Sequence, residues 1–146
     1  SITLTIIQNK DNVNLGGSHK SGFNYARSQG YQYVMVIHGD DQANLHDLLP
    51  ELVSGRYKNY DALLGSRFMK GARRHGYGRF RLYGNYVFLA LFTAYSGRGT
   101  LDIGSGLNFY GPAVINSNDH TFAADNLAFH CYFLLKMYAK RRRLHF

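Results

Sequence analysis

Short apolar runs, separated by polar and glycine-rich stretches, recur along this sequence and predict β-strands. Residues 33–37, Tyr-Val-Met-Val-Ile, form an almost continuous apolar run, which is typical of a central strand covered on both faces. Residues 1–7 alternate threonine with isoleucine and leucine and predict a buried strand before it. Residues 62–65 and 106–110 predict two further strands.

The segments between these runs have helical patterns. Residues 14–18 predict a turn with Ser18 as a helix N-cap, and residues 21–28 predict the helix that follows, ending at Gly30. Further helices are predicted for residues 48–53, 80–95 and 123–142. Strands that alternate with helices predict an α/β domain with a mostly parallel, Rossmann-like sheet flanked by helices, and ligands then gather at the carboxyl ends of the strands.

Size and composition limit the class of protein. The chain has 146 residues, the size of one domain, and 45% of them are apolar, which suits a packed core. The single cysteine, Cys131, excludes an internal disulfide and is predicted to be a core thiol. Residues 1–7 lack a secretory signature, and the apolar stretch 86–95 is about half of a membrane span. We therefore expect a cytoplasmic protein, free or peripheral at the inner face of the cytoplasmic membrane.

The formal net charge of +8 favours anionic partners: nucleic acid, acidic lipid headgroups or phosphorylated small molecules. Basic residues cluster in 67–81 and 136–143, and a solvated surface is the ordinary interpretation of each cluster. A nucleic-acid-binding module is one alternative, because aromatic and basic residues are interleaved. It is disfavoured because an acidic loop at a strand end would repel phosphate unless a metal ion lies there.

That acidic loop is His38-Gly39-Asp40-Asp41-Gln42, directly after the run 33–37. Carboxylates delivered by a buried strand can hold Mg²⁺ or Mn²⁺, which prefer oxygen ligands and often share them with substrate phosphates. The competing interpretation is an acidic turn that caps the next helix.

Three further segments have polar or flexible character. Gly65-Ser66-Arg67 follows the strand 62–65 and offers a guanidinium fork and a hydroxyl to phosphate, or else forms a surface turn. Residues 70–85 combine glycines with arginines, as a lid over a diphosphate or a basic surface loop would. Asp102-Ile103-Gly104-Ser105-Gly106 allows close backbone approach, and Asp102 could bind an acceptor hydroxyl or order its own loop.

Taken in order, these segments resemble the family 2 inverting glycosyltransferases of GT-A fold, and most closely the branch of dolichol-phosphate mannose synthases and polyprenyl-phosphate glycosyltransferases. The resemblance covers roughly residues 12–112. It depends on the ordered set Asn14-Leu15-Gly16, Gly30, His38 to Gln42, Gly65-Ser66-Arg67, Arg81 with Asn85, and Asp102 to Gly106. It implies metal-assisted transfer of a sugar from a nucleotide-diphosphate sugar, UDP-linked rather than GDP-linked, to a polyprenyl-phosphate or sugar acceptor.

The resemblance also assigns residues. Asp40 and Gln42 would hold Mg²⁺ or Mn²⁺, and the catalytic set is Asp40, Arg67 and Asp125, the last as base for an acceptor hydroxyl. Substrate contacts are expected from His38, Asp41, Gln42, Ser66, Arg79, Arg81, Asn85, Asp102, Ser105 and Gly106. His38 stands where the family has the first aspartate, so it could be a nitrogen ligand, a ribose contact or a sign of altered metal use, and Asp41 could supply the second carboxylate.

The beginning of the sequence departs from the family. The family's first strand and its Pro-x-Tyr-Asn-Glu-like turn, which holds the nucleotide base, do not precede Ser1, and residues 1–7 resemble the family's second strand. We therefore expect residues 1–146 to form a single, incomplete glycosyltransferase domain, with an uncovered sheet edge that favours homo-oligomers. A non-catalytic remnant of the fold is the alternative.

Overall fold

A mixed four-stranded sheet forms the centre of the part of the chain that the computed structural model describes, which is residues 3–40, 43–69 and 78–146, without the side chains of Arg79 and Arg81. The strands are β1 (Val34–Ile37), β2 (Ala62–Leu64), β3 (Leu107–Tyr110) and β4 (Leu144–His145), in the order β1-β3-β2-β4. Strand β3 is antiparallel to both β1 and β2, whereas β4 is parallel to β2. The α/β class is thus confirmed, but the prediction of a mostly parallel sheet is wrong.

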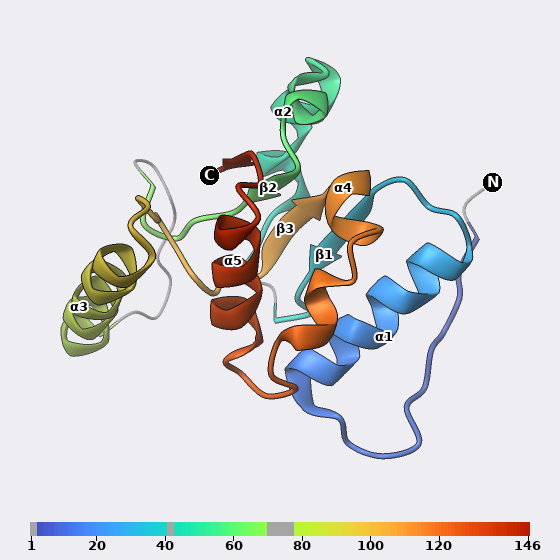
Figure 1. Cartoon of the computed structure of the whole chain (residues 1–146), viewed down its shortest axis with the longest axis horizontal. Coiled ribbons are helices and arrows are strands. Elements are labelled where there is room, and N and C mark those ends of the chain that lie inside the picture. The colour runs from blue at the N-terminus through green and yellow to red at the C-terminus, as the bar shows by residue number, and fades with distance from the viewer. Residues whose placement is uncertain (1–2, 41–42, 70–77) are drawn as a thin grey trace.

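Helices α1 (Asn14–Ser28), α4 (Pro112–Ile115) and α5 (Phe129–Ala139) lie over one face of the sheet (Figure 1). Helix α2 (Leu49–Val53) lies at the end of the molecule near the carboxyl terminus, and α3 (Arg79–Ser96) stands apart from the other helices. Short 3₁₀ turns complete the described structure: η1 (Leu45–Asp47), η2 (Arg56–Asn59) and η3 (Asp119–Phe122). No described helix is long and apolar enough to cross a membrane.

The alternation of side chains along the strands divides the core between the two sheet faces. Ala62, Leu64 and Tyr110 belong to the main core cluster with α5 and α1, and Val34 and Val36 pack against it. Leu63, Leu107 and Phe109 form a smaller cluster on the opposite face with Leu48. On β1 this second face stays open, because Met35 and Ile37 are exposed. The prediction that both faces of this strand are covered is therefore wrong.

Three sequence predictions fail at element boundaries. Residues 3–7 form no strand and are exposed, with Leu4 and Ile6 open to solvent, because nothing in the sheet pairs with them. The predicted turn 14–18 is already helical, since the Asp125 carbonyl accepts hydrogen bonds from the backbone N–H groups of Gly16 and Gly17. The predicted helix 123–142 is shortened to α5, because the segment before it holds that carbonyl against α1.

Candidate functional site

The polar segments predicted from the sequence meet at one edge of the sheet. Strands β1 and β2 flank β3 and are both antiparallel to it, so their carboxyl ends lie beside the start of β3. The His38 N–H donates to the Gly106 carbonyl at 2.9 Å, and the Gly65 N–H donates to the Leu107 carbonyl at 2.9 Å. A Cβ on Gly65 would lie 2.5 Å from the Leu107 oxygen, so this close approach requires glycine.

Arg67 and Asp102 form the main ion pair of this edge. The guanidinium Nη2 lies 2.7 Å from Asp102 Oδ1, and Nε donates to Oδ2 at 2.8 Å. The Asp102 side chain is 1% exposed, so it orders its own loop instead of presenting a carboxylate to an acceptor. Burial alone would raise the pKa of Asp102, but hydrogen bonds from Arg67 and from the Gly104 N–H bring it below its ordinary value.

The two predicted serines are used within the protein. The Ser66 hydroxyl donates to the Leu101 carbonyl and accepts from the Phe68 N–H, which holds the loop after β2 beside the loop before β3. Ser105 Oγ accepts a hydrogen bond from the Leu107 N–H. Gly106 lies directly against His38, since a Cβ there would come within 3.2 Å of its ring. These residues shape the edge, and any ligand contact would add to their internal bonds.

An open cleft of about 190 Å³ lies beside the Arg67–Asp102 pair. Its polar lining includes Arg67, Asp102, Asn85 from α3, and His130 from α5, while Phe88, Leu89 and Leu127 contribute apolar walls. The structure thus brings Asn85 to the same place as Arg67 and Asp102, as the resemblance implies.

Cys131 also lines the cleft and is only half-buried, so the prediction of a core thiol is correct in part. Burial raises the pKa of its thiol.

The remaining predicted residues are placed differently. Asp40 is exposed just beyond β1, while Asp41 and Gln42 lie outside the described residues, as do most of the predicted lid and the side chains of Arg79 and Arg81. Asp125, the predicted base, forms an ion pair of 2.7 Å with Lys20 on α1 and is largely exposed. It is held at the N-terminal end of α1, so a direct role at the cleft has no geometric support.

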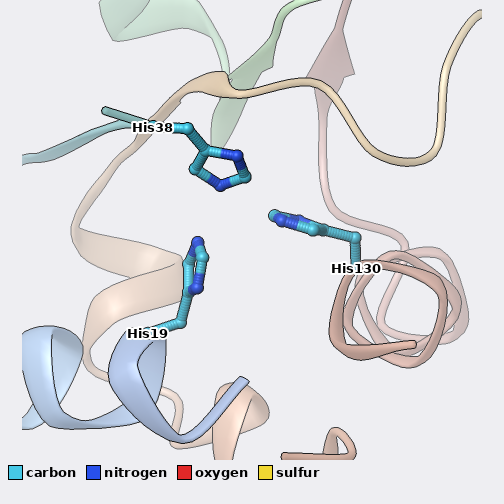
Figure 2. Close-up of side chains that lie close together, drawn as sticks. All are labelled: His19, His38 and His130. Atoms are coloured by element: carbon cyan, nitrogen blue, oxygen red, sulfur yellow. The ribbon is translucent and has the colours of Figure 1, made fainter. Parts of the chain in front are cut away.

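Sequence reasoning missed a cluster of three histidines at this edge. His19 on α1, His38 after β1 and His130 on α5 point their rings toward one another (Figure 2). One ring nitrogen from each lies within 4.8 Å of the other two. Burial, with the neighbouring His19 and His38, lowers the pKa of His130 to about 3, and burial also lowers the pKa of His19. Burial therefore favours the neutral form of His19 and His130, and neutral imidazole is the form that binds metals.

No local sequence motif indicates this cluster, because residues 19, 38 and 130 follow no metal-binding spacing. Only the fold brings them together. Comparisons with protein-family profiles, with curated proteins and with solved structures give no match to this chain.

Proposed function

We propose that this protein binds a nucleotide-diphosphate sugar at the edge formed by β1, β3 and β2 and transfers the sugar, with inversion, to a lipid-phosphate or sugar acceptor. One observation supports this most: three segments expected to act together, His38 to Asp40, Gly65 to Arg67 and Asp102 to Gly106, lie at one sheet edge beside a cleft. If the order of these segments resembled the family by chance, the three segments would not need to lie together in the fold.

In this proposal Arg67 and Asp102 act together. The bidentate pair fixes the plane of the guanidinium at the lining of the cleft, where its charge would stabilise the leaving diphosphate. Asp102 is then a positioning residue that acts through Arg67. The acceptor oxygen would attack the anomeric carbon opposite the diphosphate as the bond between that carbon and the diphosphate breaks. A phosphate acceptor is already ionised and needs no base, which agrees with the pairing of Asp125 with Lys20.

The residues present fit a hard divalent ion at Asp40. Asp40 is exposed just beyond β1, and Mg²⁺ or Mn²⁺ commonly uses one or two carboxylates together with substrate phosphates. When bound, the ion would neutralise charge on the diphosphate. Gln42 is the other expected ligand and lies outside the described residues.

Helix α3 supports a lipid-linked acceptor. Its exposed apolar residues recur every three or four positions and share one face: Phe80, Tyr83, Val87, Leu91 and Tyr95. The helix stands at one end of the molecule (Figure 1) and carries no acidic residue in its first turn. An aromatic face on a chain of net charge +8 suits the interface of an anionic membrane.

Calorimetric titration with UDP and with GDP, with and without Mn²⁺, tests the binding step. We expect Mn²⁺-dependent binding of UDP that Asp40→Asn weakens about tenfold or more. Asp47→Asn, an exposed carboxylate in η1, is the matched control and should leave binding unchanged. Metal-independent binding that Asp40→Asn does not alter would count against the site. Binding without release of UDP from UDP-sugars in the presence of polyprenyl phosphate would indicate the non-catalytic remnant.

A further inference from the structure

The three histidines that converge at the sheet edge form a preassembled set of nitrogen ligands (Figure 2). We propose that His19, His38 and His130 bind one divalent transition-metal ion of the zinc class. The three side chains come from two helices and the end of a strand, so the fold itself positions them. This site is separate from the Mg²⁺ or Mn²⁺ expected at Asp40, and it does not depend on the proposed transferase function.

The hydrogen bonding of His19 orients its ring for metal binding. Its Nδ1 lies 2.8 Å from the Leu15 carbonyl oxygen, which can only accept, so Nδ1 carries the proton. The lone pair of the neutral ring is therefore on Nε2, which is buried. Metal-binding histidines usually donate their other ring N–H to a carbonyl or carboxylate, and this contact fixes both the tautomer and the ring orientation.

The Nε2 atoms of all three histidines are buried, and none has a hydrogen-bond partner within the part of the chain that the structure describes. His19 and His130 are 9% and 8% exposed. The three ring centroids are 5.0 to 5.7 Å apart, and no hydrogen bond joins the three Nε2 atoms to one another. A single cation that accepts a lone pair from each ring would satisfy all three nitrogens.

The three imidazole ligands determine which class of ion the site can bind. Imidazole nitrogen suits Zn²⁺, Co²⁺, Ni²⁺ and Cu²⁺, whereas Mg²⁺ and Ca²⁺ prefer oxygen. Nitrogens about 2.1 Å from a tetrahedral ion lie about 3.4 Å from one another. The nitrogens here lie within 4.8 Å, so small rotations of the rings would close the site. Three protein ligands leave a fourth position open, and His130 also lines the cleft through which an ion or a fourth ligand could enter.

Dialysis against a chelator, followed by calorimetric titration with Zn²⁺ alone, tests the site. We expect one ion per chain, and at least about 100-fold weaker binding in each of His19→Ala, His38→Ala and His130→Ala. His46→Ala, which alters an exposed histidine in η1, should bind as the wild type does. Mg²⁺ at the same concentrations should not compete. Substitution with Co²⁺ should give the visible absorption of a tetrahedral ion, lost in the three variants.

X-ray absorption of the zinc-loaded wild type reports the ligands without any substitution, which covers the case of a variant that does not fold. A first shell containing three imidazoles supports the site. A shell of oxygen alone, or affinity unchanged in all three folded variants, overturns it. Neither outcome bears on UDP binding at Asp40, so the two proposals fail independently.

Discussion

The Asp102 carboxylate accepts three hydrogen bonds from Arg67, one from the backbone N–H and two from the guanidinium, across 35 residues of sequence. The carboxylate is buried, and the Arg67 side chain is 28% exposed. This pair joins the loop after β2 to the loop before β3, so it holds two parts of the candidate site in register.

Removing the arginine should therefore destabilise the protein. Arg67→Met leaves a buried carboxylate without its guanidinium, and we expect it to lower the free energy of unfolding by about 3 kcal/mol. Arg56→Met is the matched control, because Arg56 pairs with Glu51 at the surface and should cost less than about 1 kcal/mol. Urea denaturation at pH 7 measures both. Equal effects of the two substitutions would contradict a structural role for the pair.

The Arg67–Asp102 pair should also make the stability of the protein depend on pH. The pKa of Asp102 in the folded protein lies below its ordinary value of 3.8, so the unfolded chain binds the proton first as pH falls. The stability that the pair contributes should be complete above about pH 5 and lost as pH falls through the folded pKa. Denaturation of wild type and Asp102→Asn at several pH values measures this contribution as the difference between their free energies of unfolding. A contribution already lost between pH 7 and pH 5 would be inconsistent with the lowered pKa.

Two glycines of α1 provide a paired test of helix docking. A Cβ on Gly16 would lie 2.2 Å from the Ala124 carbonyl oxygen, whereas one on Gly22 meets nothing within 4 Å. Gly16→Ala should destabilise the protein by about 1–3 kcal/mol, because backbone must move. Gly22→Ala should stabilise it by about 0.5–1 kcal/mol through helix propensity. Thermal unfolding of both variants measures the contrast, and the same sign for both would refute the described packing of α1.

The exposed face of α3 predicts binding to anionic vesicles. Leu91→Glu places a charge in the middle of that face and should reduce cosedimentation with phosphatidylserine-containing vesicles severalfold. Val53→Glu, at a still more exposed apolar position on α2, is the control. Binding should also weaken between about 0.1 M and 1 M salt, because basic residues contribute. Vesicle binding that Leu91→Glu leaves intact would exclude α3 as the contact.

Local pattern was enough to locate several elements. The runs around β1, β2 and β3 and the long pattern of α3 all form the predicted element within a few residues, because each contains a continuous apolar signal. The pattern of apolar residues does not determine the direction of a strand in the sheet, however. The antiparallel orientation of β3 depends on how residues 78–106 return to the sheet, and no local residue encodes that path.

The candidate site was predictable only in part. The places where strands end indicated that the segments after β1 and β2 share one edge, but they did not place Asp102 there. A mostly parallel sheet would put the start of β3 at the opposite edge, and only its antiparallel direction brings Asp102 to Arg67. His19 and His130 carry no signal in sequence, because 111 positions separate them and only the docking of α1 against α5 brings their rings within 5.0 Å. Asp125 was chosen by elimination among acidic residues, and the structure shows its side chain paired with Lys20 and its carbonyl bonded to α1.

The hydrogen bond from Gly16 to the Asp125 carbonyl has a consequence for biosynthesis. Asp125 is synthesised more than 100 residues after Gly16, and β4 completes the sheet later still. Such long-range closure makes folding slow and prevents it from proceeding stepwise with synthesis. Nascent chains that have not yet reached Asp125 should therefore depend on chaperones and remain open to proteases.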